Sequence, residues 1–145
     1  MSPILIAALV AWVLAQSSKV AIAVLRNRTL EFSWFTATGG MPSSHSALVA
    51  ALTTAVALHE GPASSLFAIA LVFSLVVFYD ATGVRRAAGE QAEVLNQIVR
   101  DLYTAGEFRT ERLRELLGHT PVEVVVGIAL GVAVAWVVWR THGGG

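Results

Sequence analysis

Four apolar stretches constrain this chain more than any other feature of its sequence. They cover residues 3–25, 45–59, 63–79 and 121–139. About 20 mostly apolar residues can cross a bilayer as a helix, which satisfies its own backbone hydrogen bonds in lipid. Only 14% of the 145 residues are charged, against roughly 25% in soluble domains. The sequence therefore predicts an all-α fold: one integral-membrane domain, a polytopic helical bundle with about four transmembrane spans.

The stretch 80–119, between the third and fourth apolar runs, is far more polar. Its apolar side chains recur near helical spacing, which predicts one or two amphipathic surface helices. Arginines cluster in this stretch and directly after the first run; they are Arg26, Arg28, Arg85, Arg86, Arg100, Arg109, Arg112 and Arg114. The positive-inside rule then predicts that segments 26–44 and 80–119 are cytoplasmic and that both termini are outside.

Several classes of protein and site are disfavoured by composition. The chain has no cysteine, so a disulfide framework or a thiolate metal site is excluded. Its formal net charge is zero, which gives no support for a nucleic-acid partner. The first apolar run has no basic leading segment and is long for a signal peptide, so we expect a retained helix.

The segment GGMPSSHSALVA, residues 39–50, interrupts the apolar pattern. Its glycines and proline predict a turn, followed by a helix that begins near Ser43 or Ser44. The free N–H groups of such a helix start can bind phosphate oxygens, although a serine N-cap is also a common structural feature. His45 is not needed for capping, and an imidazole can protonate a leaving alkoxide near neutral pH.

Lys19 is the only lysine in the chain and lies within the first apolar run. An ionisable group there costs a few kcal/mol unless it is paired or reaches the membrane surface. Arg26 follows two turns later on the same helical face. The two cations either extend to the cytoplasmic interface as anchors or form a positively charged track into a polar site.

Asp80 stands where the third run ends, close to the negative end of the expected helix dipole. A carboxylate is disfavoured there, so we expect a partner such as Arg85 or Arg86. Paired arginines can also hold phosphate oxygens in a bidentate manner. Alternatively, Asp80 and Glu90 could hold Mg²⁺ together with a substrate phosphate, or these residues form only an interfacial salt-bridge network.

The segment LLGHTPVEV precedes the fourth run. Thr120, Pro121 and Glu123 fit a capping box with proline at the first helical position, which gives Glu123 a structural role. His119 comes just before the cap and has no such role. His119 and His45, at two helix starts on one side of the membrane, could therefore serve as nucleophile and general acid.

Gly127 and Gly131 form a GxxxG motif in the fourth run, which favours close helix packing. This packing is either within the chain or in a homodimer. His59 and His142 lie near the opposite membrane face and are expected to be bystanders.

Lys19, Arg26, the PSSH segment at 42–45 and His119 together resemble the motifs of the type-2 phosphatidic acid phosphatase superfamily, which includes the vanadium-dependent haloperoxidases. The superfamily's first motif is a lysine, six residues and Arg-Pro; this chain keeps Lys19 and Arg26 but has Asn27 in place of the proline. The second motif is Pro-Ser-Gly-His, and here Ser44 stands in place of the glycine. The third motif is Ser-Arg, five residues, histidine, three residues and aspartate. His119 and Glu123 keep its spacing from histidine to acid, but Leu113 stands where its arginine is expected. Residues 12–135 are similar, more specifically, to the divergent, YuiD-like branch of small membrane proteins of bacteria and plastids.

This resemblance implies a helical bundle with a phosphate site between its helices. His119 would be the nucleophile that forms a phosphohistidine, oriented by Glu123, and His45 would protonate the leaving group. Lys19, Arg26 and Ser43, with the helix start at Ser44, would hold phosphate oxygens. Arg85 or Arg86 is our hypothesis for the missing arginine of the third motif.

The expected function is an integral-membrane, acid-phosphatase-like hydrolase of a lipid phosphate or pyrophosphate. It would need no metal or cofactor and would work at the cytoplasmic face of a bacterial inner (plasma) membrane, with membrane lipids as its surroundings. One alternative is a Mg²⁺-dependent membrane phosphotransferase centred on Asp80 and Glu90. Another is a non-catalytic protein that binds or transports a lipid phosphate.

Overall fold

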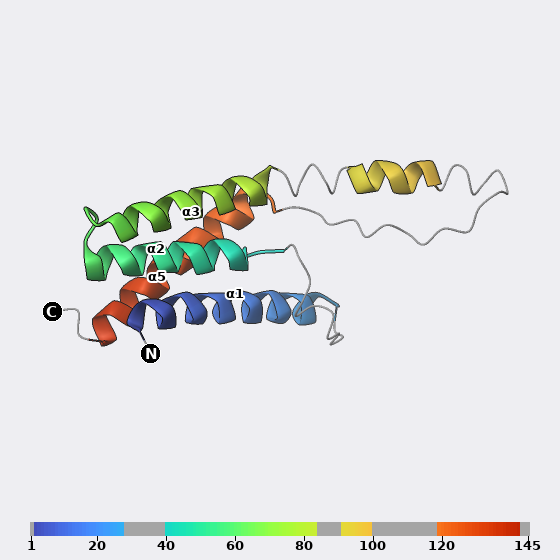
Figure 1. Ribbon diagram of the computed structural model, residues 1–145. Coiled ribbons are helices and arrows are strands. Elements are labelled where there is room, and N and C mark those ends of the chain that lie inside the picture. Colours follow the sequence, from blue (N-terminus) through green and yellow to red (C-terminus); the bar gives the residue numbers. More distant parts are fainter. Residues whose placement is uncertain (1, 28–39, 84–90, 100–118, 143–145) are drawn as a thin grey trace.

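The computed structural model describes residues 2–27, 40–83, 91–99 and 119–142. Its helices are α1 (Pro3–Asn27), α2 (Ser44–Glu60), α3 (Ser65–Thr82) and α5 (Pro121–Thr141), shown in Figure 1. A further helix over 91–99 lies in the predicted amphipathic insert; the rest of that prediction falls outside the described residues. All regular structure in the described ranges is helical, so the all-α prediction is confirmed.

Three of these helices, α1, α3 and α5, are long and apolar enough to cross a membrane. Helix α2 has 17 residues, which corresponds to a length of about 25 Å. The predicted count of four spans is therefore not confirmed. Helix α2 packs against α1, α3 and α5, and it lies between α1 and α3 in Figure 1. Because neighbouring helices cover much of its surface, α2 can bury the polar side chains of Ser44, Ser46 and Thr53 within the bundle.

Small residues bring α1, α2 and α5 close together. The buried core they share consists largely of alanines spaced four apart: Ala7, Ala11, Ala15, Ala47, Ala51 and Ala55, joined by Val134, Ala135 and Val138. In a bilayer, apolar side chains gain little by leaving lipid, so helices associate mainly through close packing at small residues. The alanine stripes therefore explain which faces of α1 and α2 meet.

The GxxxG motif of α5 packs against α2 of the same chain. A Cβ atom added at Gly127 would lie 2.5 Å from the carbonyl oxygen of Ser43, and one added at Gly131 would lie 2.8 Å from the main-chain nitrogen of Ala51. Both glycines are buried by this contact. A homodimer would therefore have to form through another surface, since these two glycines are already covered within the chain.

A buried pair of hydroxyls joins α2 to α3. Thr53 Oγ1 lies 2.7 Å from Ser74 Oγ, and the two hydroxyls also reach the carbonyl oxygens of Ala70 (3.1 Å) and Val49 (3.2 Å). Such interhelical hydrogen bonds contribute about 0.6 kcal/mol on average in membrane proteins, and up to about 1.7 kcal/mol.

We expect Thr53→Val to lower the free energy of unfolding by about 1 kcal/mol, because it removes a buried hydroxyl that contacts the Ala70 carbonyl oxygen and the Ser74 hydroxyl while nearly keeping the side-chain shape. Unfolding by SDS titration in mixed micelles measures this. Thr54→Val, at the adjacent half-buried position of α2, is the matched control. Equal effects of the two substitutions would contradict a stabilising role for the Thr53–Ser74 pair.

The polar ends of the helices meet at one end of the bundle. The main-chain N–H of His119 donates to the carbonyl oxygen of Ala81 (3.2 Å), and that of Ser43 donates to the carbonyl oxygen of Glu123 (3.0 Å). The start of α5 is thus joined to the end of α3 and to the start of α2. The start of α1 and the end of α5 lie at the opposite end of the bundle (Figure 1).

Candidate functional site

Helix α5 begins with the predicted capping box. The N-cap Thr120 accepts a hydrogen bond at Oγ1 from the main-chain N–H of Glu123 (3.4 Å). The Glu123 carboxylate reaches back to accept one from the main-chain N–H of Thr120 (3.1 Å). Pro121 occupies the first turn, where its missing N–H leaves nothing unsatisfied. The carboxylate is therefore fixed by the backbone at the start of α5.

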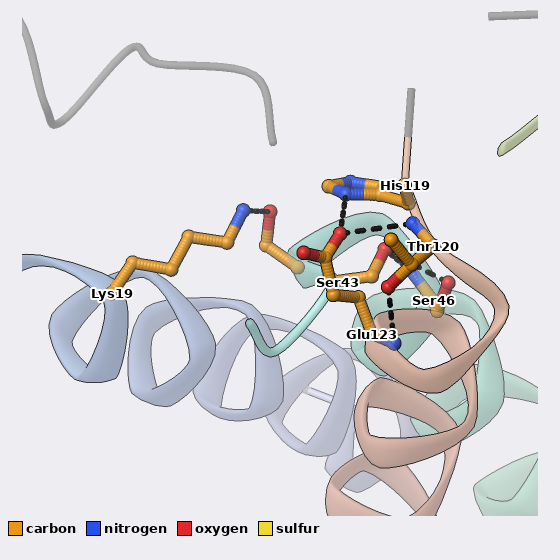
Figure 2. Close-up of polar contacts among 7 residues, drawn as sticks. Lys19, Ser43, Ser46, His119, Thr120 and Glu123 are labelled. Atoms are coloured by element: carbon orange, nitrogen blue, oxygen red, sulfur yellow. Dashed lines mark hydrogen bonds and ion pairs between the residues drawn. The ribbon is translucent and has the colours of Figure 1, made fainter. Parts of the chain in front are cut away.

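The same carboxylate oxygen also contacts His119. Glu123 Oε2 lies 3.1 Å from His119 Nδ1, and the side chains are 5% and 19% exposed for histidine and glutamate (Figure 2). An ionised carboxylate only accepts hydrogen bonds, so the imidazole donates through Nδ1. In the neutral ring this assigns the lone pair to Nε2, the atom that can act as nucleophile or base. A histidine held in this way has the geometry that a nucleophile or a general base requires.

The start of α2 lies against this pair. Ser43 is the N-cap of α2 and is fully buried. Besides the backbone bond from Ser43 to Glu123, Ser43 Oγ accepts hydrogen bonds from the main-chain N–H of Ser46 (3.3 Å) and from the Ser46 hydroxyl (2.9 Å). The helix start predicted near Ser43 or Ser44 is confirmed. Gly40, in the preceding turn, has a φ of +83°, a left-handed backbone that favours glycine.

Lys19 reaches the site from α1. Its Nζ donates to the hydroxyl oxygen of Ser44 (3.3 Å), so the side chain crosses to α2 rather than extending along α1 (Figure 2). The Glu123 carboxylate is close enough to attract the Lys19 ammonium electrostatically. Of the two readings of Lys19, this geometry favours a cation that serves the polar site over a surface anchor.

The structure thus brings five of the predicted site residues together; they are Lys19, Ser43, Ser44, His119 and Glu123. His45 lies on the first turn of α2 and is exposed. Asp80 lies half-buried in the last turn of α3. Arg26 belongs to the last turn of α1, but its side chain, like Arg85, Arg86 and Glu90, lies outside the described residues.

The two remaining histidines lie away from this site. His59 is in the last turn of α2 and His142 caps the end of α5, so both are at the end of the bundle opposite Ser43 and His119. The prediction that they are bystanders agrees with this placement.

The magnesium alternative is not supported by a cluster of ligands. Within the described ranges, no group of three or more histidine, aspartate or glutamate side chains is arranged to hold a metal ion. Glu123 already accepts hydrogen bonds from Thr120 and contacts His119. Because Glu90 lies outside the described residues, a metal site at Asp80 and Glu90 stays a prediction.

Ser46 is the site residue that sequence reasoning missed. It is fully buried and contacts Ser43 through both its backbone and its hydroxyl. The available signal was the spacing of the two serines. Ser46 follows the N-cap Ser43 by three residues, and the residue at that position lies next to the N-cap side chain.

Comparison with known proteins supplies a family and one close relative. A model described as the divergent PAP2 family matches residues 1–134. The chain is also 46% identical over 139 residues to a protein of Bacillus subtilis (strain 168) described as uncharacterized membrane protein YuiD, and the match covers 88% of each chain. No solved structure matches the chain.

Proposed function

The chain belongs to the divergent PAP2 family of membrane proteins, and on this premise we propose that it is an integral-membrane hydrolase of a lipid phosphate or pyrophosphate that works through a histidine nucleophile. The observation that carries the proposal is the buried His119–Glu123 pair, with Nδ1 and Oε2 3.1 Å apart. It faces the N-terminus of α2 and the ammonium group of Lys19, which together favour a bound anion.

In the proposed reaction, His119 Nε2 attacks the phosphorus atom and the bond from phosphorus to the lipid oxygen breaks. The leaving alkoxide takes a proton from His45, acting as general acid. Water then cleaves the phosphohistidine and releases phosphate. Glu123 stabilises the positive charge that develops on the imidazole when Nε2 forms its bond to phosphorus.

Lys19 and Ser43 would hold the phosphoryl oxygens during both steps. Preorganised donors and cations are worth most where charge develops away from water. Arg26, Arg85 and Arg86 would add positive charge, and Arg85 or Arg86 would replace the arginine that Leu113 displaces from the third motif. Since no cofactor enters these steps, we propose that none is needed.

The proposed substrate is a membrane lipid of the polyprenyl or phosphatidate type. Lys19 lies within a helix that is long and apolar enough to span a membrane. A phosphate held beside Lys19 would therefore lie within the membrane and not beyond the end of that helix. A headgroup already in the membrane reaches such a site without leaving the bilayer. We propose that the site lies on the cytoplasmic face of a bacterial plasma membrane; the arginine distribution supports this choice of face.

One specific observation favours a second candidate, a non-catalytic protein that binds or transports a lipid phosphate. Leu113 occupies the position of the third-motif arginine, and losing a cation that stabilises a transferring phosphoryl group would weaken catalysis more than binding. This candidate keeps the same pocket and the same ligand.

The test is phosphate release by the detergent-purified full chain from a panel of phosphatidate and polyprenyl phosphates and pyrophosphates, with and without EDTA. We expect release from at least one class, at an unchanged rate in EDTA. Release abolished by EDTA and restored by Mg²⁺ would replace the histidine mechanism with the phosphotransferase at Asp80 and Glu90. Binding of the lipids without release would favour the non-catalytic candidate.

A further inference from the structure

The hydroxyl of Ser43 is saturated as an acceptor. A serine hydroxyl has two acceptor lone pairs and one proton to donate. At Ser43 both lone pairs are engaged by one neighbour: the main-chain N–H of Ser46 donates from 3.3 Å and the Ser46 hydroxyl from 2.9 Å. Ser43 can therefore take part in further hydrogen bonding only by donating its own proton.

That proton has no hydrogen-bond acceptor among the described residues, whereas Ser43 itself is fully buried. A buried donor without an acceptor is unfavourable, and an anionic acceptor is the strongest partner it can gain. Ser43 also adjoins the His119–Glu123 pair, because its main-chain N–H donates to the Glu123 carbonyl oxygen (3.0 Å).

We propose that Ser46 is a positioning residue that commits the Ser43 hydroxyl to donating a hydrogen bond to a phosphate oxygen. This inference rests on the proposed function, since it assumes that phosphate occupies the site. Without the Ser46 hydroxyl, one lone pair of Ser43 would be vacant and its O–H would be free to rotate. Ser46 itself need not contact the ligand.

Ser46→Ala tests this without disturbing the start of α2. The capping bond to Ser43 uses the main-chain N–H of Ser46, which alanine retains. Ser43→Ala removes the proposed donor itself. Ser74→Ala is the matched control, because Ser74 is a similarly buried serine whose hydroxyl joins α2 to α3 instead.

The experiment measures binding of inorganic phosphate to the detergent-purified full chain by ³¹P NMR line broadening, with thermal unfolding of the same samples. We expect Ser46→Ala to weaken binding about three- to tenfold and Ser43→Ala about tenfold, the scale of one hydrogen bond to a charged group. In the double variant, Ser46→Ala should add nothing to the loss caused by Ser43→Ala, since it acts through that hydroxyl. Ser74→Ala should change unfolding but not phosphate affinity.

Additive losses, or a Ser46→Ala variant that binds phosphate like the wild type, would overturn the inference and leave the proposed function standing. A wild-type chain that binds phosphate with the expected pattern but releases none from any lipid would overturn the hydrolase and leave the role of Ser46 intact. Failure of the wild-type chain to bind phosphate would overturn both.

Discussion

Replacing His119 with alanine is expected to lower phosphate release by about a thousandfold or more. The substitution removes the atom that would form the covalent intermediate, and the loss of a nucleophile costs factors of this size or larger in hydrolases that use one. His119 is buried and held by Glu123, whereas His45, the other histidine of the proposed site, belongs to α2 and not to the start of α5. Release is measured with whichever lipid phosphate the wild-type chain cleaves.

Two further variants make this result specific. His59→Ala, at the opposite end of α2, should leave release unchanged. Glu123→Gln keeps an oxygen that can accept a hydrogen bond from the main-chain N–H of Thr120, so the cap of α5 is retained. The substitution removes the negative charge that would stabilise a positively charged His119. We expect release to fall about 10- to 100-fold in that variant. Release that survives in His119→Ala would contradict the histidine mechanism. Headgroup binding that persists without release, in the wild type as well, would favour the non-catalytic candidate.

The second large effect is expected at Gly131. Its α-carbon faces the backbone of α2, where an added Cβ would lie 2.8 Å from the main-chain nitrogen of Ala51. Backbone cannot move aside as a flexible side chain can, so Gly131→Leu would force α5 away from α2. We expect a loss of about 3 kcal/mol in the free energy of unfolding, the upper end for an overpacked core.

Val132→Leu is the matched control, because Val132 is the next residue on α5 and is 43% exposed. It should change the free energy of unfolding by no more than about 0.5 kcal/mol. Both variants are compared by SDS titration in mixed micelles, with size-exclusion chromatography to record the oligomeric state. If Gly131→Leu unfolds like the wild type but alters the oligomer, the close contact is between chains rather than between α5 and α2.

Local features of the fold could be predicted from the sequence. The starts of α2 and α5 are specified by neighbouring residues: the N-cap Ser43, and the capping box of Thr120, Pro121 and Glu123. Each of these capping signals involves residues within one helical turn, so it can be recognised from the sequence without knowing what packs against the helix. For this reason the observed helices begin and end within a few residues of the predicted apolar stretches.

The partners of each helix could not be predicted in the same way. Hydropathy treats all apolar faces alike, whereas the contacts depend on alanine and glycine stripes that let backbones approach. Hydropathy therefore predicted α2 as a short fourth span, and it could not show that α2 makes the most extensive contacts with the other helices. For the same reason, the sequence could not decide whether the GxxxG motif packs against another helix of the same chain or against a second chain in a dimer.

In the site, motif spacing identified the residues but not their contacts. His119 directly precedes the N-cap Thr120, and the Glu123 carboxylate folds back over that cap, so their pairing follows from the capping box. The direction of Lys19 does not, because its acceptor Ser44 belongs to another helix. Ser46 was missed since a serine after a capping serine reads as ordinary capping sequence until both hydrogen bonds to Ser43 are visible.

The hydrogen bond from His119 to Ala81 has a consequence for how this chain tolerates change. Its two residues, 3.2 Å apart at N and O, hold the last turn of α3 beside the start of α5, although they are far apart in the sequence. When the ends of an insertion meet, its length can vary at little entropic cost and without moving the host helices. The length of the connection between Ala81 and His119 can therefore change at little cost to the bundle, so the pairing of His119 with Glu123 does not depend on how long that connection is.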